Sequence, residues 1–292
     1  MDALDVNADL EIELLLEAIY RRFHYDFRNY AMSSLRRRLA RACDALHCAT
    51  VSRLQERVLH DASVFPMLLR YLTIQVSDMF RDPAYFLAMR ERVVPLLRTF
   101  PSLKLWIAGC SSGEEAYSFA ILLREEGLLE RTTLYATDID SDALRSAQQG
   151  IYELSRVARF SENHLKAGGR CSLSTYYTSG YDAAVFDRSL AAHIVFSDHS
   201  LSTDSVFAEV QLISCRNVLI YFDNALQNRA VGLFKDSLTR GGFLGLGTSE
   251  SLRFIEHNDA FAAFDDEQRI YRRLATRETG RARDLEACDR SR

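Results

Sequence analysis

One segment limits what this chain can fold into more than any other. An apolar run at residues 105–108 leads into a turn of small residues, 109–113, and a helical pattern begins at Glu114. A second apolar run, residues 134–137, ends on Asp138. The pattern predicts two buried parallel strands joined by a helix. Small residues let a ligand lie against the turn, and a carboxylate after the second strand can accept hydrogen bonds from both hydroxyls of a ribose. The segment therefore predicts a nucleoside-binding βαβ unit.

The start of the predicted helix selects among nucleoside cofactors. A pyrophosphate binds where backbone amides and a helix N-terminus face its oxygens, but Glu114 and Glu115 occupy that position and would repel it. S-adenosylmethionine, which carries an ammonium and a sulfonium group, suits these carboxylates better. We expect its ribose at Asp138 and its amino-acid end near Glu114 or Glu115. Two alternatives stay open. The acids could merely complement the helix dipole, or the cofactor could be a nicotinamide dinucleotide, which the paired glutamates disfavour.

The bulk composition is typical of a folded intracellular protein. With 292 residues, 48% of them hydrophobic, the chain can bury a large core, and a net charge of −4 does not favour a nucleic-acid binder. The six cysteines, and also His193 and His199, lack metal-ligand spacing, so we expect reduced thiols and no metal. The N-terminus is acidic, unlike a signal peptide, and no apolar run approaches membrane length. We therefore expect a cytoplasmic protein without membrane insertion.

The hydrophobic pattern changes along the chain and predicts several parts. Residues 1–72 have helical periodicity and predict an all-helical N-terminal domain. Residues 73–102 are expected to form a linker and cofactor-contacting segment, and residues 103–275 an α/β domain. Within it we expect strands near 105–108, 133–137, 193–197, 210–215 and 242–247, and helices near 114–126, 141–149 and 224–239. Residues 155–192 include a stretch rich in Gly, Ser, Thr and Tyr and predict an inserted antiparallel β-subdomain, and residues 276–292 predict a disordered tail.

A second polar cluster follows the strand expected at 210–215. Cys215, Arg216 and Asn217 separate two apolar runs, the second of which ends at Tyr221. Open α/β sheets bind ligands at the carboxyl ends of their strands, so this bend predicts part of the same binding site. The alternative is an ordinary strand-end turn with a solvated arginine.

Six sequence blocks, taken in order, resemble one known family. They read SSLRRRLARAC, TIQVSDMFRDPAYF, LWIAGCSSGEEAYSFAILL, ATDIDSDALRSAQQGIY, HSLSTDSVFAEVQLISCRNVLIYF and GGFLGLGTSESL. Over residues 35–273 the chain resembles the chemotaxis receptor glutamate O-methyltransferases, the CheR family. The resemblance implies a small all-helical N-terminal domain and a Rossmann-like, S-adenosylmethionine-dependent methyltransferase domain with a small inserted antiparallel β-subdomain.

The resemblance also assigns the cofactor pocket residue by residue. Where the family usually has Asn, Thr and Arg, this chain has Gln75, Ser77 and Arg81, so two of these three cofactor contacts change in reach. Where the family commonly has Asn near the adenine, this chain has Ser200, beside Leu201. The other residues expected at the cofactor are Glu115, Asp138, Cys215, Arg216 and Asn217.

The reaction implied by the resemblance is methylation of glutamate carboxylates on the cytoplasmic helices of chemoreceptors. It gives a glutamyl methyl ester and S-adenosylhomocysteine, and it serves adaptation in chemotactic signal transduction. The substrate carboxylate is ionised at neutral pH, so the enzyme has to aim the reactants rather than remove a proton. Arg81 and Tyr221 are the expected catalytic residues. We expect Arg81 to hold one carboxylate oxygen and Tyr221 to donate a hydrogen bond beside the transferred methyl group.

A run of arginines in the N-terminal domain predicts a substrate-binding face. Residues 21–41 contain seven arginines and one aspartate. On a helix, Arg37 and Arg41 share a face that Arg38 flanks, while Leu35 and Leu39 turn inward. In the family the corresponding helix is thought to contact the acidic methylation helices of receptors, so these arginines are expected to bind substrate. A solvated helix face and an RNA-binding patch are the alternatives.

Three further interpretations stay open. The changes at Gln75, Ser77 and Ser200 suit a catalytically weak cofactor-binding docking module, and the substrate could be a protein other than a chemoreceptor. A nucleic-acid methyltransferase is disfavoured, because three aliphatic residues separate Asn217 from Tyr221 where base methyltransferases keep prolines. The β-subdomain resembles one that, in some members, binds a tethering peptide at a receptor's C-terminus.

Overall fold

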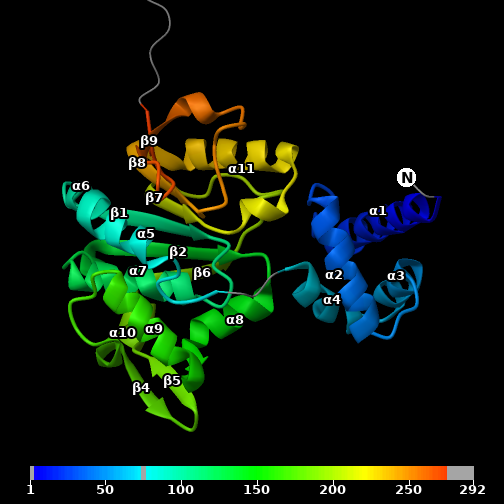
Figure 1. The fold of residues 1–292 in the computed structure, drawn as a ribbon, viewed down its shortest axis with the longest axis horizontal. Helices are drawn as coiled ribbons and strands as arrows, with labels where there is room; N and C mark the ends of the chain where they lie inside the picture. The colour runs from blue at the N-terminus through cyan, green and yellow to red at the C-terminus, as the bar shows by residue number, and fades with distance from the viewer. Residues whose placement is uncertain (1–2, 74–76, 275–292) are drawn as a thin grey trace, which may run out of the picture.

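The computed structural model describes residues 3–73 and 77–274, and its N-terminal part is all helical, as predicted (Figure 1). Leu35, Leu39 and Ala42 recur every three or four residues, and all three are buried in the core of this part. Thr50 caps the third helix by accepting a hydrogen bond from the backbone N–H of Arg53. The helices are α1 (Ala3–Phe23), α2 (Met32–Ala45), α3 (Val51–His60) and α4 (Val64–Leu72).

A seven-stranded sheet forms the centre of the α/β part. Its order is β6-β2-β1-β7-β8-β10-β9. The first five strands run parallel, and β10 pairs antiparallel with both β8 and β9. The five predicted strands are therefore confirmed, whereas β9 and β10 were not predicted. The strands are β1 (Leu103–Ala108), β2 (Thr132–Asp138), β6 (Ile194–Asp198), β7 (Val210–Cys215), β8 (Leu238–Leu246), β9 (Phe261–Asp265) and β10 (Ile270–Arg273).

Helices cover both faces of this sheet, as buried parallel strands require. In β1, Leu105 and Ile107 belong to the core on one face, whereas Trp106 and Ala108 belong to the core on the other. Residues of α7 pack into the first core and residues of α11 into the second, so these helices lie on opposite sides of the sheet (Figure 1). The three helices predicted for this domain are confirmed as α7 (Glu114–Glu125), α8 (Ser141–Gln149) and α11 (Asn224–Ser237).

The segment between the two parts is itself folded. It forms α5 (Pro83–Ala88), the π-helical η1 (Met89–Val93) and α6 (Val94–Leu97). Phe80, Tyr85 and Phe86 are buried in the core that α7 covers. The backbone N–H of Phe80 also donates to Oγ of Ser118 in α7, at 2.8 Å. The chain on either side of Arg81 is therefore anchored to the helical cover of the sheet.

The inserted β-subdomain contains the predicted antiparallel sheet, with strand order β3-β5-β4. Its strands are β3 (Ile151–Glu153), β4 (Tyr177–Gly180) and β5 (Ala183–Phe186). It also contains a helix that was not predicted, α9 (Leu154–Lys166), which buries Val157, Phe160 and His164 along one side. In Figure 1, α9 lies between the strands of the β-subdomain and the layer of α7.

Short elements complete the described chain: η2 (Leu129–Arg131), η3 (Leu173–Tyr176), α10 (Arg188–Ala191), η4 (Leu219–Tyr221) and η5 (Asn258–Ala260). Within residues 3–73 and 77–274, none of the helices combines the length and the apolar content needed to cross a bilayer. The predicted disordered tail, residues 276–292, lies outside the described residues.

Candidate functional site

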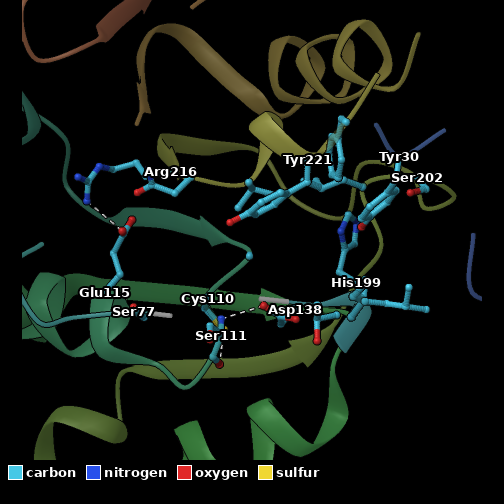
Figure 2. Close-up of a pocket in the computed structure, with 18 of the residues that line it drawn as sticks. Tyr30, Ser77, Cys110, Ser111, Glu115, Asp138, His199, Ser202, Arg216 and Tyr221 are labelled. Carbon is cyan, nitrogen blue, oxygen red and sulfur yellow. Dashed lines mark hydrogen bonds and ion pairs between the residues drawn. The ribbon is translucent and has the colours of Figure 1, made fainter. Parts of the chain in front are cut away.

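A cavity of about 350 Å³ lies at the carboxyl ends of β1, β2 and β7. The order of the sheet reverses there, because β2 pairs with one side of β1 and β7 with the other. Open α/β sheets bind ligands at such a point, and the volume lies within the range of small-molecule sites, about 300–1,000 Å³. Figure 2 shows Glu115 and Arg216 at one end, Tyr221 and Asp138 in the middle, and Tyr30, His199 and Ser202 at the other end.

The turn after β1 forms one wall of the cavity. Gly109 has φ +75°, and a Cβ atom there would lie 2.5 Å from Cγ2 of Val218, so a larger residue would push the two walls apart. The backbone N–H groups of Gly109 and Cys110 both donate to the carbonyl oxygen of Thr137, at 2.8 and 2.9 Å. These bonds tie the turn to the end of β2, and its residues Gly109, Cys110 and Ser111 line the cavity.

Asp138, at the end of β2, lines the cavity next to this turn. Its Oδ2 accepts a hydrogen bond from the backbone N–H of Ser111 (2.8 Å), and its Oδ1 accepts one from that of Asp140 (3.0 Å). Burial raises the pKa of Asp138 to about 6, although the two amides oppose the shift. Each oxygen makes one of these bonds, so the carboxylate keeps the capacity to accept two hydroxyl groups.

Glu115 and the buried Arg216 form an ion pair at the far end of the cavity. Nη1 of Arg216 lies 3.1 Å from Oε2 of Glu115, and its Nη2 lies 2.7 Å from Oδ2 of Asp82. Oε1 of Glu115 accepts a hydrogen bond from Ser214 Oγ (2.6 Å), and since that hydroxyl has one proton, Tyr85 donates to Ser214 (2.9 Å). The chain of contacts fixes both charges at the cavity wall.

The two glutamates at the start of α7 take different directions. Glu115 lines the cavity, whereas Glu114 is fully buried away from it and pairs with Arg156, at 2.9 Å. The two carboxylates therefore do not act together against a pyrophosphate, contrary to the prediction. One of them does not face the cavity, and the other is partly neutralised by Arg216.

Glu250 holds the loop after β7 and was missed by the sequence analysis. Its side chain is 4% exposed. It accepts hydrogen bonds from the backbone N–H groups of Gly247 (2.6 Å), Asn217 (2.9 Å), Val218 (2.9 Å) and Ile220 (3.3 Å). One carboxylate therefore fixes the loop in which Asn217, at φ +61°, lines the cavity.

The N-terminal part closes the cavity at the carboxyl ends of the strands. Tyr30 forms an isolated β-bridge with Phe222, and the backbone N–H of Ala31 donates to the carbonyl oxygen of Tyr221 at 2.9 Å. The guanidinium of Arg38 lies 4.3 Å from the ring centroid of Tyr221, and its Nη1 donates to the carbonyl oxygen of Leu72. Tyr30 and Arg38 thus bring the helical part to the cavity.

Arg38 does not lie where the sequence analysis placed it. It is buried, whereas Arg37 and Arg41 are exposed on α2. Among the described residues, its Nε and Nη2 have no hydrogen-bond partner. Arg38 therefore belongs to the cavity wall, and Arg37 and Arg41 form a separate exposed face.

Most of the predicted site residues line this one cavity. These are Arg38, Ser77, Arg81, Glu115, Asp138, Leu201, Arg216, Asn217 and Tyr221. Cys215 is fully buried in β7, Ser200 lines a smaller neighbouring pocket, and Gln75 lies outside the described residues. Lining residues that were not predicted include Tyr30, Leu72, Thr73, His199, Ser202 and Phe222.

His199 has a structural contact as well as a place at the cavity. Its Nε2 lies 3.2 Å from the carbonyl oxygen of Ser205, and its ring packs edge-on against Trp106 with centroids 5.2 Å apart. In the described part of the chain, no cluster of three or more His, Cys, Asp or Glu has the arrangement of a metal site.

Comparison with known proteins assigns both parts of the chain to one family. The family model for the CheR methyltransferase all-alpha domain matches residues 10–73, and that for the CheR methyltransferase SAM binding domain matches residues 75–270. The Pseudomonas putida protein named Cher3 is 58% identical over 267 residues, which cover 91% of this chain and 98% of that protein. The Listeria innocua chemotaxis protein methyltransferase is 29% identical, with 84% and 92% covered. Chemotaxis protein methyltransferase 2 of Vibrio cholerae is 33% identical, with 63% and 65% covered.

Proposed function

The chain belongs to the CheR methyltransferase family, and we propose that it methylates glutamate side chains on the cytoplasmic helices of chemoreceptors. The observation that carries the proposal is that Asp138, the Glu115–Arg216 ion pair, Arg81 and Tyr221 all line one cavity. Asp138 and the ion pair suit a nucleoside with a zwitterionic amino-acid end. Arg81 and Tyr221 suit a second reactant that carries a carboxylate.

The cavity residues fit S-adenosylmethionine in three places. The carboxylate of Asp138 suits the two ribose hydroxyls. Glu115 and Arg216 present opposite charges that match the ammonium and the carboxylate of the amino-acid end. At the opposite end, Leu201 and the rings of Tyr30 and His199 give the adenine surfaces to pack against.

Bound S-adenosylmethionine supplies a methyl group activated by a sulfonium. The residues of the chain then have to bring an ionised carboxylate to it and exclude water, which is catalysis by proximity and orientation. We assign Arg81 to hold one oxygen of the substrate carboxylate, so that the other oxygen stays nucleophilic. Tyr221, in the middle of the cavity, donates a hydrogen bond beside the reacting groups. No general base is required, because the carboxylate is already ionised at neutral pH.

Helix α2 contributes to the binding of the proposed substrate in two ways. Arg37 and Arg41 on its exposed face attract an acidic receptor helix. Arg38, on its buried face, reaches the ring of Tyr221. Burial lowers the pKa of Arg38, so an incoming carboxylate would compensate a charge that the fold has desolvated. We therefore assign Arg38 to drawing the glutamate into the cavity, where Arg81 then holds one of its oxygens.

Partners and compartment follow from the same proposal. The methylated helices lie in the cytoplasm, and so would this enzyme. A receptor tethering peptide could add to the sheet of the β-subdomain at the edge strand β4, since β4 pairs with β5 alone among the described strands and most of its residues are exposed.

Labelled methyl transfer tests the proposal. With methyl-labelled S-adenosylmethionine and receptor cytoplasmic fragments from the same cell, we expect base-labile label that is released as methanol, the signature of a glutamyl ester. Arg81→Ala should lower the rate at least ~100-fold, as expected when an anchor for the reacting group is lost, while S-adenosylhomocysteine still binds. The exposed Arg188→Ala is the matched control. Full activity in Arg81→Ala would remove Arg81 from the mechanism, and label stable to base would refute the ester.

A further inference from the structure

One polar side of α9 contacts the segment that carries Ser77 toward the cavity. Nδ2 of Asn163 donates to the carbonyl oxygen of Met79 at 3.1 Å. Nη2 of Arg159 lies 2.8 Å from Oδ2 of Asp78. Nη2 of Arg156 donates to the carbonyl oxygen of Ser77. Residues 156, 159 and 163 share one face of a helix, so α9 contacts three consecutive residues of this segment.

Arg156 also reaches the turn on the other side of the cavity wall. Its Nη1 lies 2.9 Å from Oε1 of Glu114, the fully buried first residue of α7. The other oxygen of Glu114 accepts a hydrogen bond from Ser112 Oγ at 2.7 Å. The carbonyl oxygen of Ser112 accepts one from the hydroxyl of Tyr152 in β3, at 2.9 Å. The β-subdomain therefore contacts both the turn after β1 and the segment at Ser77.

The guanidinium geometry explains why an arginine occupies this position. Its planar fork presents two Nη atoms at fixed spacing, so one group can bind a carbonyl and a carboxylate in different segments at once. The ring of Phe160 supports it from the same helix, with the guanidinium carbon 4.9 Å from the ring centroid. A buried carboxylate such as Glu114 needs a partner of this kind. Arg156 thereby links Ser77 to Glu114, which follows the turn at Ser111, and Ser77 and Ser111 both line the cavity.

We propose that Arg156 is a positioning residue of the cofactor site, through which the β-subdomain holds the two walls of the cavity at the spacing that S-adenosylmethionine requires. The inference rests on the proposed function, because it takes this cavity as the cofactor site. Arg156 itself does not line the cavity. Its effect on the ligand is therefore indirect, through Ser77 and through Glu114 with the adjoining turn.

The test compares cofactor binding with folding stability in matched variants. Titration calorimetry with S-adenosylhomocysteine should give a Kd at least ~10-fold higher for Arg156→Ala than for the wild type, because two wall segments lose their common anchor. Lys166→Ala, on the same helix, loses only an exposed ion pair with Glu162 and should bind as the wild type does. Arg156→Lys should be intermediate, since one ammonium cannot hold both partners in a fork.

A double variant separates positioning from charge balance. Arg156→Ala leaves Glu114 buried without its ion-pair partner, so it lowers the Tm as well as the affinity. Glu114→Gln combined with Arg156→Gln removes that uncompensated charge. We expect the double variant to recover most of the Tm and to keep the weakened affinity, because the contact with Ser77 and the geometry of the fork are still missing.

Two results would overturn the inference. One is an unchanged Kd in Arg156→Ala, and the other is recovery of both Tm and affinity in the double variant, which would make Arg156 a charge-balancing residue only. A wild-type protein that does not bind S-adenosylhomocysteine would overturn the proposed function and this inference together. If the wild type binds and methylates while the variants match it, the inference alone fails.

Discussion

Asp138 shows how the surroundings of one carboxylate set the conditions for ligand binding. Burial raises its pKa to about 6, while the amides of Ser111 and Asp140 favour the charged form. The charged form is also the one that accepts hydrogen bonds from two hydroxyl groups. Its ionisation should therefore govern cofactor affinity in a pH range that is easy to reach.

Cofactor affinity should fall as the pH drops through 6. With a pKa near 6, Asp138 is almost fully ionised at pH 7.5 and only roughly one tenth ionised at pH 5, so the Kd for S-adenosylhomocysteine should rise about tenfold between these values. Asp138→Asn should bind weakly throughout and lose most of this dependence. Calorimetric titrations at pH 5 to 8 measure both. A wild-type Kd that stays constant over this range would contradict the role given to Asp138.

Helix α2 shows how one element can serve two surfaces. Arg37 and Arg41 point outward, and Arg38 points inward to Tyr221. Arg38 follows Leu35 by three residues, which is the spacing of the buried side of a helix. The helical spacing therefore indicated that Arg38 is buried. It was expected on the exposed side because arginine is charged.

Charge reversal on the exposed face of α2 should separate receptor docking from cofactor binding. Arg37→Glu combined with Arg41→Glu should lower receptor methylation at least ~10-fold at low salt, because attraction to acidic helices becomes repulsion. The affinity for S-adenosylhomocysteine should stay the same. The difference from wild type should shrink as the ionic strength rises, since salt screens exposed charges. Arg145→Glu combined with Arg188→Glu, at two other exposed arginines, changes the net charge by the same amount and controls for it. An equal loss in that variant would refute a specific docking face.

At the scale of the whole molecule, the sequence was sufficient to predict those elements whose structure follows from the local hydrophobic pattern. Continuous apolar runs predicted the parallel strands, and the change from helical periodicity to alternating strands and helices predicted the two-part architecture. The strands β9 and β10 are short, β10 is half-polar, and α9 lies beside a Gly- and Ser-rich stretch, so their local signals were weak. The parallel strands and the two-part architecture could therefore be predicted from the sequence, whereas β9, β10 and α9 could not.

The candidate site was predictable only in part, because several of its contacts join residues distant in sequence. Glu250 holds the loop at Asn217 across 33 positions, and Arg156 joins Glu114 to Ser77. No spacing rule connects such residues before the fold is known. The directions of Glu114 and Glu115 also depend on how α7 packs, since adjacent residues on a helix point about 100° apart.

Titration of the whole protein with S-adenosylhomocysteine, and separately with NAD⁺, is the most direct test of the central claim that this cavity is an S-adenosylmethionine site. The account predicts saturable binding of one S-adenosylhomocysteine per chain and no measurable heat with NAD⁺. Binding of NAD⁺, or no heat with S-adenosylhomocysteine at any protein concentration, would contradict it.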